Sequence, residues 1–271
     1  MDSNETKNGF KNSMKDNDSA PPIVTKIDYK GTTVIVLEEV YEPAEDSFLL
    51  AECAVLEISK FLSGSENRNE NRNENRNENR NENRNENETQ NEAQNETRNE
   101  AQNETRNEAR NEKFTVFEVG CGSGFVSAFI QNNFSNISVS AVDINPNAVL
   151  CAQKNGVFAE RSDMFDRLPN GDLFDMIVFN PPYLPTSEDE KVGGYLNYAF
   201  DGGVLGRDSI DSFLKEVGFY LKENGFFLLL ISSLTGLDEV ILEMGKNGFS
   251  AKIVGKEKCS FEELIVLKGE F

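Results

Sequence analysis

Short apolar runs alternate with amphipathic stretches over the second half of the chain, and this alternation predicts strands and helices in turn. The strand candidates are residues 114–119, 137–142, 157–159, 175–179 and 226–231. Apolar residues at helical spacing follow at residues 125–133, 146–155, 209–222 and 238–246. Two last runs, 249–254 and 261–267, are expected to close the sheet as antiparallel strands. The pattern predicts an α/β fold with a mostly parallel sheet.

The N-terminal part of the same unit, residues 23–65, reads as a hairpin followed by a helix. Residues 27–29 and 33–37 flank Gly31 as two short strands. Pro43 and the acidic pair Glu45-Asp46 are typical of a helix start. The apolar spacing after them predicts a helix to about Leu62, which ends before Gly64.

Residues 66–112 interrupt this pattern with a four-residue repeat of Asn, Glu and Arg. The segment contains no Val, Ile, Leu, Met or aromatic residue, so it cannot join an apolar core. In a helix its Glu residues would repel one another at i,i+4, as would its Arg residues. We therefore expect a disordered insertion in the surface of one domain, whose core is residues 113–271; a contact with a partner is the alternative. The polar residues 1–22 are expected to be a disordered leader.

Composition removes several classes of function. The 271 residues include no histidine, which excludes Ser-His-Asp and Cys-His catalysis. The four cysteines form no CxxC pair, so a zinc site is not expected and free thiols in the cytoplasm are the simplest account. No apolar run is long enough to span a membrane. The net charge is −20, and nucleic acid needs a basic face, so a protein or small-molecule substrate is favoured.

A glycine-rich turn joins the strand 114–119 to the helix 125–133. Gly120, Gly122 and Gly124 let the backbone turn tightly and approach a ligand. Their spacing differs from the dinucleotide and phosphate-binding patterns. Glu118, two residues before the first glycine, argues against a phosphate ligand and for a cationic one. A plain strand-turn-helix connection is the alternative.

Two acidic residues follow the next two strands. Asp143 ends the strand 137–142 about 20 residues beyond the glycine turn, where a carboxylate can bind both hydroxyls of a ribose. Asp163 falls at the edge of the third strand, where it can bind an adenine amino group. Asp143 can also be a residue that merely flanks a helix, and Asp163 alone is a weak signal.

Asn180-Pro181-Pro182-Tyr183 follows the strand 175–179 directly. The two prolines fix the backbone and end the strand at Asn180. The Asn180 side-chain oxygen and the Pro181 carbonyl can each accept one N–H of an uncharged NH2 group, and Tyr183 can lie flat against a planar target. The alternative is a loop that only ends a strand.

The order of these motifs along the chain resembles that of class I S-adenosylmethionine-dependent methyltransferases. The motifs are Glu118, the three glycines, Asp143, Asp163 and Asn180 to Tyr183. The stretches VYEPAEDSFLL (40–50), FEVGCGSGFVSAF (117–129), DINP (143–146) and FNPPYLP (179–185) resemble one branch, the archaeal and eukaryotic HemK-like glutamine methyltransferases. The resemblance covers residues 27–268 apart from the repeat. It implies a seven-stranded doubly wound, Rossmann-like sheet.

The resemblance also implies roles for individual residues. Glu118, Gly120, Gly122 and Asp143 would bind S-adenosylmethionine. Asp163 and Met164 would lie around the adenine, and Ser47 and Asn180 would also contact the cofactor. Asn180, Pro181, Pro182 and Tyr183 would hold the acceptor.

The implied reaction is N5-methylation of the glutamine in the GGQ motif of a class-1 translation release factor. Members of this branch work as heterodimers with a small zinc-binding activator protein, which is therefore the expected partner.

Several alternative functions would use the same cofactor-binding half of the site. An adenine-N6 methyltransferase acting on DNA or RNA would use Asn180 to Tyr183 equally well, but the acidic charge argues against it. Methylation of lysine in another protein, or of a small molecule, suits this motif less. A non-catalytic scaffold would not require Glu118, Asp143 and Asn180 together.

Overall fold

The computed structural model describes residues 21–82, 113–168, 171, 173–183, 202–203 and 205–271; of residues 65–82 it describes the backbone alone. Seven strands form one sheet in the order β5-β4-β3-β6-β7-β9-β8. The strands are β3 (Phe114–Val119), β4 (Ile137–Asp143), β5 (Phe158–Arg161), β6 (Phe174–Phe179), β7 (Leu221–Ser232), β8 (Ser250–Lys258) and β9 (Glu263–Glu270). The first five are parallel, and β9 runs antiparallel between β7 and β8. The predicted doubly wound sheet is confirmed. Of the two closing strands, β9 is antiparallel to its neighbours as expected, whereas β8 runs in the same direction as β7.

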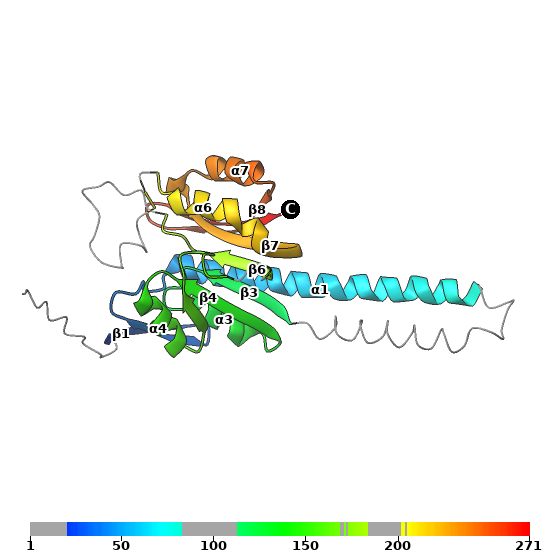
Figure 1. The fold of residues 1–271 in the computed structure, drawn as a ribbon, viewed down its shortest axis with the longest axis horizontal. Coiled ribbons are helices and arrows are strands. Elements are labelled where there is room, and N and C mark those ends of the chain that lie inside the picture. The colour runs from blue at the N-terminus through cyan, green and yellow to red at the C-terminus, as the bar shows by residue number, and fades with distance from the viewer. Residues whose placement is uncertain (1–20, 83–112, 169–170, 172, 184–201, 204) are drawn as a thin grey trace, which may run out of the picture.

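Helices cover both faces of the sheet (Figure 1). One face carries α1 (Glu45–Glu82), α3 (Phe125–Asn133) and α4 (Pro146–Lys154). The other face carries α6 (Asp208–Glu216) and α7 (Leu237–Lys246). The hairpin of β1 (Ile23–Tyr29) and β2 (Thr32–Leu37) packs on α3 and α4. Two short 3-10 helices, η2 (Val217–Tyr220) and η3 (Ser233–Thr235), flank β7.

The sheet is apolar on both faces because helices bury it from both sides. Strand β7 shows this alternation: Leu228 and Leu230 join the apolar cluster under α1 and α3, whereas Phe227 and Leu229 join the cluster under α6 and α7. All four side chains are fully buried. Consecutive residues point to opposite faces of a strand, so a continuous apolar run in the sequence corresponds to a central strand.

The strand order reverses beside β3. From β3 the chain proceeds outward through β4 and β5, and it then returns to β6 on the other side of β3. In doubly wound sheets, ligands bind at the carboxyl ends of the strands at this reversal. Here those ends are Val119 of β3 and Phe179 of β6, which are register partners. The glycine turn and Asn180 therefore begin side by side.

Helix α1 does not end near Leu62 as expected but continues to Glu82, through the first part of the repeat (Figure 1). Over residues 66–82 the structure therefore differs from the expected disorder. Packing of the first turns supplies the costly helix nucleus, and each further residue then adds a hydrogen bond; Glu and Arg are also good helix formers. Residues 83–112 and the leader up to residue 20 lie outside the described residues.

A second difference concerns the helix expected at 209–222. Helix α6 ends at Glu216, and β7 already begins at Leu221, which pairs with Phe174. An irregularity in this pairing coincides with Asn224, whose φ of 65° is left-handed, and with Gly225. Tertiary pairing with β6 overrides the local helical pattern here.

Within the described part of the chain, no helix is both long and apolar enough to cross a membrane.

Candidate active site

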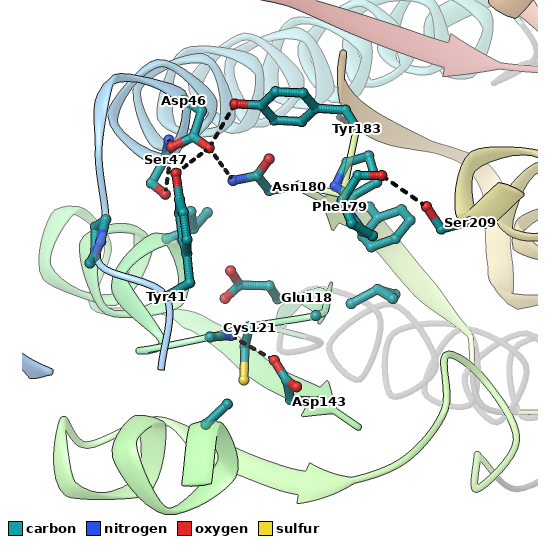
Figure 2. Close-up of a pocket in the computed structure, with 18 of the residues that line it drawn as sticks. Tyr41, Asp46, Ser47, Glu118, Cys121, Asp143, Phe179, Asn180, Tyr183 and Ser209 are labelled. Atoms are coloured by element: carbon teal, nitrogen blue, oxygen red, sulfur yellow. Dashed lines mark hydrogen bonds between the residues drawn. The ribbon is translucent and has the colours of Figure 1, made fainter. Parts of the chain in front are cut away.

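A cavity of about 1210 Å³ opens where the strand order reverses (Figure 2). Its volume exceeds that of a typical single-ligand pocket. Every site residue predicted from the sequence lines it: Ser47, Glu118, Gly120, Gly122, Asp143, Asp163, Met164, Asn180, Pro181, Pro182 and Tyr183. Residues 136 positions apart in the sequence thus face one space. The cavity has room for a nucleoside-sized cofactor together with the side chain of a second substrate.

The glycine turn between β3 and α3 has the backbone shape that the sequence predicts. Gly120, Gly122 and Gly124 have φ of 65°, 54° and 77°, all in the left-handed region that favours glycine. Gly120 and Gly122 line the cavity, whereas Gly124 does not. A Cβ on Gly124 would lie 2.8 Å from the Cβ of Ala152 in α4. The third glycine therefore serves helix packing, and the first two leave the cavity wall open.

Glu118 is a buried carboxylate at the cavity wall and is 3% exposed. Its Oε2 accepts the backbone N–H of Ser127 at 3.0 Å and the Ser127 hydroxyl. Burial raises the pKa of Glu118 to about 8, against the opposing effect of these two hydrogen bonds. A cationic group in the cavity would favour the charged form, which is the chemistry expected of this position.

Asp143 ends β4 and holds the glycine turn. Its Oδ2 accepts the backbone N–H of Gly122 at 2.8 Å, and its Oδ1 accepts that of Asn145, also at 2.8 Å. Burial raises the pKa of Asp143, although the backbone hydrogen bonds oppose the shift. A carboxylate offers about four acceptor positions, so both oxygens keep capacity for the two hydroxyls of a ribose.

Asp163 and Met164 follow β5 on the same side of the sheet. The backbone N–H of Ser162 donates to the Asp143 carbonyl at 3.1 Å, which places this turn beside the end of β4. Asp163 is exposed, and Met164 is half-buried with a left-handed φ of 39°. Both line the cavity next to Asp143, where a base attached to a ribose would lie.

Asn180 presents its two amide ends to different surroundings. Nδ2 donates to Oδ2 of Asp46 at 3.2 Å. Oδ1 is buried and has no hydrogen-bond partner among the described residues. A buried acceptor without a partner is costly, so an N–H donor from a ligand is the natural partner. The Pro182 carbonyl accepts the Ser209 hydroxyl at 3.3 Å and is thereby tied to α6.

Asp46 is the residue that sequence reasoning missed. Its carboxylate is 3% exposed and accepts three side-chain donors on Oδ2: Asn180, the Tyr41 hydroxyl at 2.8 Å and the Tyr183 hydroxyl at 3.3 Å (Figure 2). From the sequence, the acidic pair indicates only a helix start. Asp46 also stands four residues before Leu50, on the buried stripe of α1. The sequence signal that could have identified Asp46 is its spacing, which places a carboxylate on the same helix face as buried apolar residues.

The Tyr183 ring is less free than the sequence suggested. Its hydroxyl donates to Asp46, and its ring packs against the apolar cluster under α1 and α3. Burial and the charge of Asp46 raise the pKa of both Tyr183 and Tyr41 above the ordinary tyrosine value. Both hydroxyls are therefore neutral donors at physiological pH.

The described part of the cavity offers hydrogen-bond acceptors and carboxylates, and none of its described residues is identified as an activated nucleophile. Burial, with Asp143 and Glu118 nearby, raises the pKa of the Cys121 thiol well above its usual value. A protonated thiol is a poor nucleophile. No group of His, Cys, Asp or Glu within the described ranges is arranged to hold a metal ion. The arrangement is suited to positioning and electrostatic stabilisation of a reaction between two bound molecules.

Comparisons with known proteins agree with this chemistry. A family model described as "Methyltransferase small domain" matches residues 104–193. A putative protein N5-glutamine methyltransferase of Methanocaldococcus jannaschii is 43% identical over 158 residues, covering 56% of this chain and 79% of the relative. Human methyltransferase HEMK2 is 31% identical over 162 residues, covering 56% of this chain and 75% of the relative.

Two further matches extend over most of the chain. The Schizosaccharomyces pombe eRF1 methyltransferase catalytic subunit mtq2 is 24% identical over 249 residues, covering 85% of this chain and 89% of the relative. The solved E. cuniculi Mtq2–Trm112 complex contains a chain with the same fold, with a TM-score of 0.52, 20% identity, and coverage of 86% of this chain and 98% of that one.

Sequence identity, the family model, the shared fold and the residues gathered in the cavity lead to one assignment. The chain belongs to the HemK-like protein-glutamine N5-methyltransferases, class I enzymes that take their methyl group from S-adenosylmethionine, and to their archaeal and eukaryotic branch.

Proposed function

We propose that this enzyme methylates N5 of the GGQ glutamine in a class-1 translation release factor. The observation that carries the proposal is the buried Oδ1 of Asn180, an acceptor without a partner among the described residues. A glutamine side chain brings an uncharged NH2 group that fills this acceptor with one N–H. The name of the S. pombe relative, an eRF1 methyltransferase subunit, supports a release factor as the protein that carries the glutamine.

The site residues divide between the two substrates. Glu118 and Asp143 would hold the cationic and ribose parts of S-adenosylmethionine, with Gly120 and Gly122 allowing its close approach. Asp163 and Met164 would border the adenine, and Ser47 and Asn180 would also touch the cofactor. Pro181, Pro182 and Tyr183 complete the wall around the acceptor.

The reaction needs no nucleophilic side chain. S-adenosylmethionine, when bound, would supply a methyl group from its cationic sulfur; the sulfur–carbon bond would break with its electron pair left on sulfur as the carbon–nitrogen bond forms. The amide nitrogen becomes positively charged and loses one proton to solvent. Asn180 Oδ1 and the Pro181 carbonyl would accept the two N–H groups, orient the nitrogen and stabilise its developing charge. A chain without histidine can perform this chemistry.

A small zinc-binding activator protein is the proposed heterodimer partner. The support is the similarity in fold to the catalytic chain of the Mtq2–Trm112 complex. Co-expression of the two proteins, followed by size-exclusion chromatography and a zinc measurement on the complex, tests this part. Two separate peaks, or a complex without zinc, would contradict it. The proposed location is the cytoplasm, where the four free thiols of the chain would stay reduced.

A methyl-transfer assay with labelled S-adenosylmethionine tests the reaction. The enzyme, with and without its partner, is incubated with a release factor and with the same factor carrying Gln→Ala in its GGQ motif. Label on the first factor alone is the expected result. Equal label on both factors would mean that another residue is the acceptor.

A nucleic-acid arm in the same assay tests the main rival. DNA and RNA oligonucleotides containing adenine replace the release factor. Label on them and none on the factor would overturn the proposal in favour of adenine-N6 methylation. Carboxylates dominate the described cavity wall, and Lys258 is the one Lys or Arg along it. That charge distribution disfavours a polyanionic substrate.

A further inference from the structure

The contact between Asp46 and Asn180 joins the start of α1 to the end of β6 across the cavity (Figure 2). An aspartate carboxylate accepts hydrogen bonds and does not donate them. It therefore distinguishes the two ends of the Asn180 amide, which have almost the same shape. Nδ2 must face Asp46, and Oδ1 must face away from it. Oδ1 is the buried atom without a partner among the described residues.

Without that carboxylate the amide can rotate by half a turn at little steric cost. The rotated amide would present Nδ2 to the acceptor nitrogen, so two donors would face each other. The orientation of Asn180 is thus set by a residue that need not touch the acceptor. The other donors on the carboxylate, Tyr41 and Tyr183, hold Asp46 itself in place.

The charge of Asp46 adds a second effect. An amide that donates through Nδ2 to a carboxylate becomes more polarised, which strengthens Oδ1 as an acceptor. The acceptor nitrogen gains positive charge as the methyl group arrives. The Asp46 carboxylate lies one hydrogen bond from the Asn180 amide, and Asp46 is only 3% exposed. A buried carboxylate favours the positive charge on the acceptor nitrogen more than a solvent-exposed carboxylate would.

We propose that Asp46 is a positioning residue of the methyl-transfer reaction, which orients and polarises the Asn180 amide so that Oδ1 accepts from the substrate nitrogen. The inference rests on the proposed function for the identity of that nitrogen. It assigns to the acidic pair of the N-terminal helix a role in the acceptor half of the site.

Asp46→Asn is the most informative variant. Ser47 donates its backbone N–H and its hydroxyl to Asp46 Oδ1, at 2.5 and 3.1 Å. A backbone N–H cannot become an acceptor, so the new asparagine turns its single oxygen toward Ser47. Its NH2 then faces Asn180, which must rotate to accept it. The variant therefore keeps size and shape but reverses the Asn180 amide.

The first experiment uses NMR on the enzyme labelled with ¹⁵N, without any acceptor. The side-chain NH2 signal of Asn180 is identified by its loss in Asn180→Ala. In the wild type one of its protons should be shifted downfield by the carboxylate, and Asp46→Asn should abolish that shift. An Asn180 signal at the ordinary position in the wild type would overturn the inference, whatever the acceptor is.

The second experiment is a kinetic double-mutant cycle. Asp46→Asn should lower kcat roughly 10²-fold while the Kd for S-adenosylmethionine changes less than about threefold, within the additivity error of independent sites. Added to Asn180→Ala, the same change should lower kcat by less than about threefold, because groups that act as one unit are not additive. Glu42→Gln, an exposed carboxylate outside the cavity lining, is the matched control and should retain full activity.

Each outcome decides one question. Additive losses in the cycle, or loss of cofactor affinity with intact kcat, would overturn the positioning role. If Asp46→Asn does not fold, Asp46→Ala replaces it, and the wild-type NMR signal still tests the contact. If the wild type methylates no release factor, the proposed function fails, while the NMR experiment judges the contact by itself.

Discussion

The carboxylate of Glu118 is held by Ser127: Oε2 accepts the backbone N–H of Ser127 at 3.0 Å and also its hydroxyl. The first residue is the penultimate residue of β3, just before the glycine turn, and the second lies in the first turn of α3 just after it. The turn is thereby closed by a side chain that also faces the cavity. The same group shapes the turn and supplies negative charge for a cationic ligand.

Cofactor affinity should depend on pH through Glu118. Its pKa of about 8 means that the carboxyl is mostly protonated at pH 7 in the cofactor-free protein. A cation binds the charged form more tightly, so affinity should rise with pH, on the order of tenfold per unit below pH 8, and the contribution of Glu118 should level off above it. Calorimetry in two buffers of different ionisation enthalpy should show release of a proton on binding.

Glu118→Gln is the control for that titration. The amino group of the cofactor also titrates near pH 8, and its loss of charge would weaken binding as pH rises. The variant should bind less tightly and should lose the rise below pH 8. An unchanged rise in the variant would assign the titration to another group of the protein, because deprotonation of the cofactor amino group acts in the opposite direction.

Asp143→Asn should weaken cofactor binding by roughly 10- to 100-fold. The amide can accept only one of the two backbone N–H groups that the carboxylate now accepts, and it loses the charged hydrogen bonds to a ribose, each worth about 1.5–3 kcal/mol. Calorimetric Kd values measure the effect. Equal affinity for S-adenosylmethionine and for an analogue without the ribose hydroxyls in the wild type would contradict this role.

Asn180→Ala should leave cofactor binding nearly unchanged and lower turnover by about 10²-fold or more, because it removes the acceptor that orients the substrate nitrogen. Steady-state kinetics with saturating cofactor measures kcat, and calorimetry measures Kd. Normal turnover in this variant would refute the role assigned to Oδ1.

Gly124→Ala should destabilise the fold. The residue has a φ of 77°, and the new Cβ would lie 2.8 Å from the Cβ and 3.0 Å from the Cα of Ala152. Strain of this kind costs about 1–3 kcal/mol, which thermal unfolding would detect as a fall in Tm. Gly156→Ala provides a comparison, since its φ of 84° is similarly left-handed but no atom lies within 4 Å of the added Cβ. Equal losses would mean that backbone strain alone acts.

The repeat should be removable. The Phe61 and Phe114 rings lie 5.2 Å apart, so the packed part of α1 and the start of β3 meet on either side of the insertion. A short Gly/Ser linker in place of residues 66–112 should therefore span the gap. The shorter loop should stabilise the fold, since each halving of the length of a flexible loop contributes about 0.6 kcal/mol.

Unfolding and cofactor binding measure the outcome of the deletion. Loss of folding would mean that the insertion is a structural part of the domain. Retained cofactor binding with loss of activator binding would instead assign the insertion to the partner contact.

Local patterns in the sequence determined most of the fold. The apolar runs at 114–119, 137–142 and 175–179 predicted strands β3, β4 and β6 almost to the residue. Nearly all residues of β3 and β6 are buried, so the composition of these two strands is set by the core. Gly120 and Gly122 predicted the turn because glycine adopts a left-handed backbone conformation at little energetic cost. Positions at strand ends, such as Asp143 and Asn180, were thereby placed at the correct edge of the sheet.

Tertiary structure alone decided how the acceptor half of the site is held. Asp46 and Asn180 are 134 residues apart in the sequence, and their contact requires α1 to begin over the carboxyl end of β6. Periodicity reports which face of an element is buried, but it does not report what lies opposite. The extension of α1 to Glu82 has a similar origin, since a packed helix can propagate into residues that would not start one. Composition determines the conformation that a segment favours by itself, whereas packing against neighbouring elements determines its contacts and how far a helix extends.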